Sequence, residues 1–139
     1  MVIADTGFWI ALADRRDAFH EAAKAAYAEV QEPLVTTWPV VTETCYLFLS
    51  RFGSKAQIAF LDTYAEGAFD VFEIEAAHVR RLQTLLQRYA DLPMDLADAS
   101  LVLLAEHLGH GRILSTDRRD FRAYRWKDRQ PFENLLRRE

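Results

Sequence analysis

Short apolar segments alternate along this chain with longer stretches in which apolar residues recur at helical spacing. The short segments predict β-strands over residues 1–4, 34–37, 69–74 and 112–115. The longer stretches predict helices over residues 19–30, 38–52, 55–64, 79–89 and 96–108. Strands that alternate with helices are typical of α/β proteins, in which a mostly parallel sheet is sandwiched between helices. We also expect a turn at residues 5–7 and a last edge strand at residues 124–126.

The predicted helix over residues 96–108 carries the strongest burial signal. Its segment 101–105 reads Leu-Val-Leu-Leu-Ala, which is apolar on every side of a helix, so we expect this helix to be central and buried. This segment, like every other apolar run of the chain, is far shorter than the ~20 residues that a bilayer span requires. Together with an acid, Asp5, so close to the N-terminus, this favours a cytoplasmic protein that does not cross a membrane.

Length and composition suit one globular domain over residues 1–139. Half of the residues are hydrophobic and 27% are charged, which argues against disorder. The single cysteine, Cys45, excludes an internal disulfide and any zinc site built from paired cysteines.

The net charge of −4 is unevenly distributed. Residues 112–139 carry nine basic and five acidic side chains, whereas residues 1–111 carry eight basic and sixteen acidic ones. This asymmetry suits a protein that holds cations at one place and contacts polyanions at another. Ordinary solvated faces produce the same imbalance, and on charge alone that interpretation is favoured.

Two acids follow predicted strands. Asp5 comes directly after the first strand, and Asp117 follows the strand that begins at residue 112. Ligands of open parallel sheets bind beyond the carboxyl ends of the strands, so both positions suit a binding site. Taken singly, each aspartate is equally explained as the cap of a following helical turn.

Two further acids lie on predicted helices among apolar neighbours. Glu43 shares a helical stripe with Val40 and Leu47, and Asp98 directly precedes the apolar segment of the central helix. A buried carboxylate is costly unless it is paired or binds a metal. The alternative for Asp98 is a first-turn acid favoured by the helix dipole, with Asp95 as the N-cap.

Four carboxylates that lie close together repel one another unless a divalent cation holds them. Oxygen ligands without a histidine or cysteine cluster favour Mg²⁺ or Mn²⁺ over zinc. The four histidines share no metal-ligand spacing, and most of them are expected to be exposed helix residues.

These residues, in this order and on these elements, resemble the PIN-domain ribonucleases, and more narrowly the VapC toxins of bacterial toxin–antitoxin pairs. The similarity rests on Asp5-Thr6-Gly7 after a strand, Glu43 in a helix, Asp98-Ala99 at a helix start and the segment Ser115–Phe121. It extends over residues 2 to 126. It implies a Mg²⁺- or Mn²⁺-dependent endoribonuclease that leaves 5′-phosphate and 3′-hydroxyl ends.

The resemblance also implies roles for single residues. The four catalytic acids would be Asp5, Glu43, Asp98 and Asp117. Asp5, Asp98 and Asp117 would bind the metal, and Glu43 would orient the attacking water or complete the outer shell. Thr6 and Ser115 would support the acids through hydrogen bonds.

The sequence departs from the family pattern at two positions. Gly7 stands where many members carry a second Ser or Thr, and Ser115 stands where many carry Thr. Both changes slightly weaken the hydrogen-bond support of the acids. Asp95 and Asp120 are additional acids near matched positions and are the candidates to join or replace the four.

Basic residues interleaved with aromatic ones follow the fourth acid. This composition suits backbone contacts and base stacking with unpaired RNA. For the aromatic residues Phe121, Tyr124 and Trp126 we favour a place in the core. For the arginines we favour phosphate contact by one or two members of the set Arg118, Arg119 and Arg122.

The resemblance implies a homodimer and a small VapB-like antitoxin whose C-terminal segment covers the acids. The apolar residues 46–49 and the helix beyond them, residues 52–60, are the candidate groove, although buried helix pairs give the same pattern.

Three alternatives remain open at the level of sequence. The chain could be a housekeeping PIN ribonuclease without an antitoxin, a phosphotransfer domain, or a non-catalytic RNA- or protein-binding module. Gly7 stands where a phosphatase signature requires a second aspartate, and residues 112–126 lack the lysine of a receiver domain. The presence of all four acids argues against a module that has lost its activity.

Overall fold

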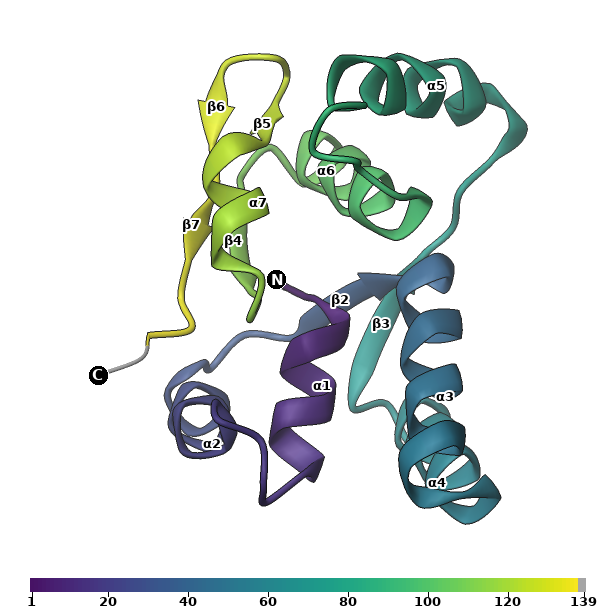
Figure 1. Ribbon diagram of the computed structural model, residues 1–139, viewed down its shortest axis with the longest axis vertical. Helices are drawn as coiled ribbons and strands as arrows, with labels where there is room; N and C mark the ends of the chain where they lie inside the picture. The colour runs from purple at the N-terminus through teal and green to yellow at the C-terminus, as the bar shows by residue number, and fades with distance from the viewer. Residues whose placement is uncertain (138–139) are drawn as a thin grey trace.

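The computed structural model describes residues 1–137, and Figure 1 shows how their helices and strands are arranged. The elements, in chain order, are β1 (Val2–Ala4), α1 (Thr6–Ala13), α2 (His20–Glu29), β2 (Leu34–Thr37), α3 (Trp38–Phe52), α4 (Ser54–Ala65), β3 (Phe69–Phe72), the 3₁₀ turn η1 (Ala76–His78), α5 (Val79–Arg88), α6 (Leu96–Leu108), β4 (Arg112–Leu114), α7 (Arg118–Ala123), β5 (Arg125–Trp126), β6 (Gln130–Pro131) and β7 (Glu133–Asn134).

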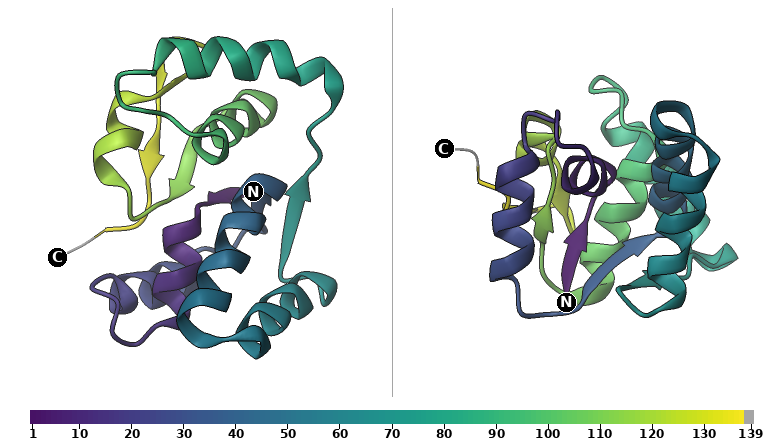
Figure 2. Two further views of the ribbon diagram at one scale, coloured as in Figure 1. Left: turned by 45° about the vertical axis from the view of Figure 1, so that its right-hand side comes forward. Right: turned by 90° about the horizontal axis from the view of Figure 1, so that it is seen from below.

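Five strands form one parallel sheet in the order β3-β2-β1-β4-β7. Helices flank this sheet, as Figures 1 and 2 show, so the α/β prediction with a mostly parallel sheet is confirmed. From β1 the chain builds outward through β2 to β3, and it then returns to place β4 on the other side of β1. The switch in strand order therefore falls between β1 and β4, which is where open α/β sheets bind ligands.

The centre of the molecule is formed by β1 and α6. All three residues of β1 are fully buried, and α6 contacts both β1 and β2. The apolar segment Leu101–Ala105 of α6 is buried along its whole length, as its composition predicts. One polar contact fixes α6 on the sheet: the hydroxyl oxygens of Ser100 and Thr37 lie 2.6 Å apart.

The expected edge strand at residues 124–126 is wrong. Arg125 and Trp126 form β5, which pairs with β6 in a separate antiparallel hairpin, and the edge of the main sheet is β7. The hairpin turn is formed by Lys127 and Asp128, both in the left-handed region. β7 has only two residues and no apolar alternation, so its place depends on pairing with β4 and cannot be seen in the sequence.

Two helices were not expected. α1 begins directly after β1, where only a turn was expected, and the six-residue α7 follows Asp117. Both are short, so helical periodicity has little length in which to appear. Phe121 and Tyr124, at and beyond the end of α7, are buried as predicted, and Trp126 is partly buried.

Ion pairs attach the hairpin to α5 and α6. Arg81 binds both carboxylate oxygens of Glu106, at 2.9 and 2.7 Å, and Asp128 of the hairpin turn at 2.8 Å. Arg88 binds Asp128 at the same distance. Within residues 1–137, no helix is long and apolar enough to cross a membrane.

Candidate active site

Asp5 joins the end of β1 to the start of α1. It is the N-cap of α1, and its Oδ1 accepts a hydrogen bond from the backbone N–H of Thr6 at 2.7 Å. Its Oδ2 accepts a hydrogen bond from the Ser115 hydroxyl at 2.8 Å. Burial raises the pKa of Asp5 to about 6, against the effect of these two hydrogen bonds. Asp5 is therefore both a helix cap and a buried acid of the candidate site.

Ser115 connects the two acids that follow β1 and β4. Its Oγ donates to Asp5 and accepts from the backbone N–H of Asp117 at 3.0 Å. The Asn134 side chain holds the Ser115 backbone through two hydrogen bonds. Its Oδ1 accepts from the Ser115 N–H at 3.2 Å, and its Nδ2 donates to the Ser115 carbonyl at 2.8 Å. Asp117 in turn caps α7, because its Oδ1 accepts from the backbone N–H of Asp120 at 3.1 Å. β7, which supplies Asn134, thus supports the site from the edge of the sheet.

Asp98 faces the same region from the first turn of α6. Asp95 is the N-cap of this helix, and its Oδ1 accepts from the backbone N–H of Asp98 at 2.8 Å, as expected. The Tyr124 hydroxyl donates to Asp98 Oδ2 at 2.8 Å. Burial raises the pKa of Asp98 to about 7, while the Tyr124 hydrogen bond opposes the shift. Burial and Asp98 raise the pKa of Tyr124, so its phenol stays protonated and remains a donor.

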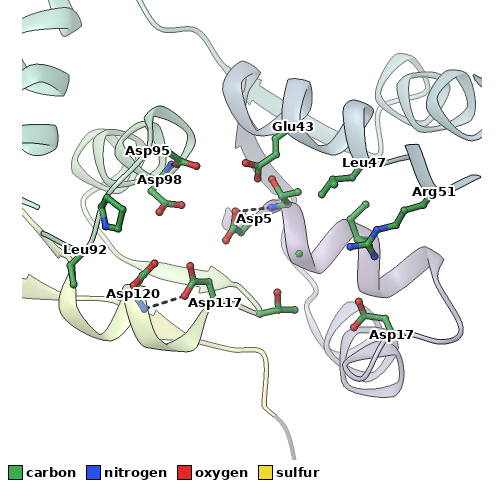
Figure 3. Close-up of a pocket in the computed structure, with 15 residues that line it drawn as sticks. Asp5, Asp17, Glu43, Leu47, Arg51, Leu92, Asp95, Asp98, Asp117 and Asp120 are labelled. Atoms are coloured by element: carbon green, nitrogen blue, oxygen red, sulfur yellow. Dashed lines mark hydrogen bonds between the residues drawn. The ribbon is translucent and has the colours of Figure 1, made fainter. Parts of the chain in front are cut away.

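The predicted acids line one pocket, shown in Figure 3. Asp5, Glu43, Asp98 and Asp117 reach it from α1, α3, α6 and the start of α7. Thr6 also lines it, and within residues 1–137 its buried hydroxyl oxygen has no hydrogen-bond partner. Ser115 lies behind the pocket lining, where it contacts Asp5 and Asp117.

Three of the acids come close enough to share one cation. Ligand oxygens of Asp98, Asp117 and Asp120 all lie within 4.8 Å of one another. Asp120 Oδ1 is buried without a hydrogen-bond partner in the described chain, and its nearest cation, Arg119 Nε, is 3.7 Å away. A buried carboxylate oxygen that lacks a hydrogen bond and lies beside two other carboxylates fits a divalent cation. Asp120 therefore joins the cluster, whereas Asp5 lies in the same pocket outside this set of three.

The predicted RNA-contacting arginines differ in their surroundings. Arg118 Nη2 donates to the carbonyl of Leu136 at 2.7 Å, and its guanidinium lies over the Phe19 ring at 5.8 Å. Its side chain is thus engaged within the chain. Arg119 and Arg122 are exposed on α7, with 82% of the Arg119 side chain accessible to solvent.

Sequence reasoning missed three polar contributors. Tyr124 was expected to be a core aromatic residue, and it is fully buried, but its hydroxyl binds Asp98. Asn134 carried no signal, because its relation to the acids exists only after β4 and β7 pair, whereas Thr116 lay inside the segment Ser115–Phe121 without an assigned role. Thr116 lines the pocket, and its Oγ1 lies 1.9 Å from the position that a Cβ at residue 7 would take. The small residue at position 7 is therefore required by Thr116.

Comparison with known proteins agrees with this geometry. The PIN domain family model matches residues 2–127. The chain is 32% identical over 124 residues to "Ribonuclease VapC26" of Mycobacterium tuberculosis, covering 89% of this chain and 92% of that protein. The crystal structure of M. tuberculosis VapC20, described as a sarcin-ricin loop cleaving toxin, superposes with a TM-score of 0.78 at 24% identity. That match covers 84% of this chain and 90% of VapC20, and it supports the fold.

A parallel sheet with acids gathered at its switch point defines a PIN-type nuclease fold. The chain belongs to the PIN-domain family, among its VapC-type members.

The raised pKa values predict how metal-free protein responds to pH. Asp5 and Asp98 hold protons more tightly in the folded chain than in the unfolded one. Their contribution to stability is therefore lost as the pH rises from about 4, near the pKa of both groups in the unfolded chain, through about 6 and 7, the pKa values of Asp5 and Asp98 in the folded chain. With chelator at pH 8, Asp98→Asn should therefore have a higher Tm than the wild type, and the gap should narrow at pH 5. Thermal unfolding at both pH values measures this difference. A variant less stable than the wild type at pH 8 would show that Asp98 is an important structural residue.

The contact between Gly7 and Thr116 predicts a non-additive pair of substitutions. Gly7→Ala places a methyl group against Thr116 Oγ1 and should cost roughly 1–3 kcal/mol of stability, measured by denaturant unfolding. Thr116→Ala in the same chain should recover most of that loss, since it removes the oxygen. Equal losses in the single and double variants would place the cause elsewhere.

Proposed function

We propose that this protein is a divalent-metal-dependent endoribonuclease and the toxin of a toxin–antitoxin pair. The observation that carries the proposal is the group of Asp98, Asp117 and Asp120, with Asp5 and Glu43 lining the same pocket of a PIN domain. The ribonuclease name of its 32% identical relative supports the reaction type. We further propose that the PIN domain spans residues 1–139, since β7 lies beyond the matched residues 2–127 and still pairs with β4.

In this proposal the residues that would hold the metal are Asp98, Asp117 and Asp120, with Asp5 completing the set. Because all of these ligands are carboxylate oxygens, Mg²⁺ is the favoured ion and Mn²⁺ its substitute. When bound, such an ion offsets the negative charge of the site, lowers the pKa of water and stabilises charge on phosphoryl oxygens.

The chain's own groups position the reactants. The Ser115 hydroxyl and the Thr6 backbone N–H donate hydrogen bonds to Asp5 and keep its carboxylate at the end of β1. Tyr124 fixes the orientation of Asp98 through its hydroxyl. Glu43 faces the acids from α3 and would accept a proton from the attacking water. The water oxygen bonds to phosphorus as the bond to the 3′ oxygen breaks, and the departing 3′ oxygen takes up a proton from solvent, which leaves 5′-phosphate and 3′-hydroxyl ends.

An apolar surface on α3 and α4 supports the toxin assignment. The exposed large apolar side chains of these helices include Tyr46, Leu49, Phe52, Ile58 and Leu61. Leu47 lines the acidic pocket from a face of α3 that is turned by about 100° from Tyr46. An antitoxin segment that covers the apolar surface and continues around α3 would therefore reach the acids. We propose that the protein acts in the cytoplasm as a homodimer silenced by a VapB-like antitoxin; a housekeeping nuclease of the same fold would not need this surface.

Loss of one carboxylate tests the activity. Purified protein should cut cellular RNA into discrete fragments with Mg²⁺ or Mn²⁺ but not with chelator, and Asp98→Asn should reduce the rate by at least 100-fold while remaining folded. The variant removes charge and little volume, so circular dichroism serves as its control. Well-folded wild-type protein that cuts no RNA class with either metal would move the assignment to a binding module.

Arg119 tests the proposed RNA contact on α7. Because the Arg119 side chain is 82% exposed beside the acid cluster, Arg119→Ala should weaken RNA binding several-fold. The dependence of affinity on salt should flatten by about 0.7 in log–log slope for the loss of one single-strand phosphate contact. Fluorescence anisotropy at three salt concentrations measures both quantities. Unchanged affinity and slope would remove Arg119 from the RNA path.

A further inference from the structure

The pocket lining contains one basic side chain, Arg51, among the residues that the structure describes. Every other charged group of this lining is a carboxylate, and Asp17 lies at the same end of the pocket as Arg51, as Figure 3 shows. RNA carries a phosphate at every nucleotide, so a strand that crosses the pocket meets repulsion wherever a carboxylate lacks a cation. Arg51 is therefore the one side chain of this described lining whose charge attracts a phosphate without a bound cation.

The helix geometry directs Arg51 into the pocket. Glu43, Leu47 and Arg51 are spaced four residues apart on α3 and so share one face of the helix. Arg51 lies two turns beyond Glu43, roughly 12 Å along the helix axis. Long side chains of a helix lean toward its N-terminus, which here is the direction of Glu43. Figure 3 shows the Arg51 side chain reaching from α3 toward the middle of the pocket.

Intramolecular contacts hold Arg51 only weakly. Its Nη1 lies 3.8 Å from Asp14 Oδ2, beyond hydrogen-bond distance, and 46% of its side chain is exposed. Arg81, by contrast, makes hydrogen bonds of 2.7 to 2.9 Å to two carboxylates. An ion pair at this longer distance, with one half-exposed partner, contributes little to stability. The Arg51 guanidinium can therefore turn to a ligand at small cost.

We propose that Arg51 binds the backbone phosphate of a nucleotide that flanks the cleaved bond. The proposal rests on the nuclease function above and names a subsite of the same pocket. A guanidinium presents paired N–H donors that match two phosphate oxygens, which a lysine ammonium does not. The acid cluster and α7 lie on one side of the pocket and Arg51 on the other (Figure 3), so an RNA strand is held on both sides of the reacting phosphate.

Binding of a short single-stranded RNA tests this subsite. Anisotropy is measured at three salt concentrations in the Asp98→Asn background, which leaves the RNA intact. Adding Arg51→Gln should weaken binding roughly fivefold and flatten the log–log salt slope by about 0.7, the value for one single-strand phosphate. Arg51→Lys should retain the slope and part of the affinity. In the otherwise native enzyme, Arg51→Gln should raise KM more than it lowers kcat.

Matched variants separate binding from a structural role. Arg80→Gln removes an equally exposed cation from α5, outside the pocket, and should change neither affinity nor slope. Asp14→Asn removes the weak intramolecular partner of Arg51 and should leave affinity unchanged or slightly improved. Unchanged affinity and slope in Arg51→Gln would overturn the proposal. An equal loss of affinity and Tm in Arg51→Gln and Asp14→Asn would also overturn it.

If the protein is not a nuclease, the same experiments give a different set of results. In that case wild-type protein cuts no RNA with either metal, while the anisotropy measurement still reports whether Arg51 contacts RNA. A binding-only protein whose affinity falls in Arg51→Gln supports the subsite without the reaction. A protein that neither binds nor cuts RNA overturns both proposals.

Discussion

The hydrogen bond from Ser115 to Asp5 joins residues 110 positions apart, and the candidate site depends on it. It can form only because β4 pairs with β1 in parallel, so that both strands end at the same edge of the sheet. The chain places two strands on one side of β1 before it returns to the other side. That change of direction opens the crevice into which Asp5 and Asp117 project. β7, through Asn134, then fixes the backbone of Ser115.

Around this crevice, the fold stabilises an arrangement that electrostatics opposes. Burial raises the pKa of Asp5, Asp98 and Asp117 alike, which means that each carboxylate is less favourably ionised here than in water. The apolar body of α6 offsets this cost by anchoring Asp98 on a helix that cannot easily move. The Tyr124 hydroxyl adds orientation from a side chain that is itself fully buried. The stability of the core thus offsets the free-energy cost of grouping these carboxylates, whose negative charge a bound cation would neutralise.

The acids were recognisable from the sequence because each lies at a local landmark. Asp5 and Asp117 follow strands, and Asp98 precedes an apolar helix, so local patterns made them candidates, and the resemblance to PIN-domain ribonucleases assigned their roles. Asp120 was visible only as an additional acid. It comes close to Asp98 and Asp117 only because the first turn of α7 directs it toward α6 across the pocket. Tyr124 was assigned correctly to the core, but no pattern indicates which carboxylate a buried phenol will meet. The edge strand was misplaced because residues 124–126 alternate like a strand, yet pair locally in a hairpin.

The sequence by itself determined the α/β class and the central helix, because hydrophobic periodicity is a local property, and its resemblance to the PIN-domain ribonucleases singled out four acids. The tertiary structure alone decided which acids lie close enough to share a cation, which hydroxyls bind them and where the one basic side chain in the described lining of the pocket lies. Those facts depend on the β1–β4 and β4–β7 pairings and on the packing of α3 and α6. Contacts between residues distant in the chain arise from the sum of many weak packing interactions, and no short stretch of sequence records that sum.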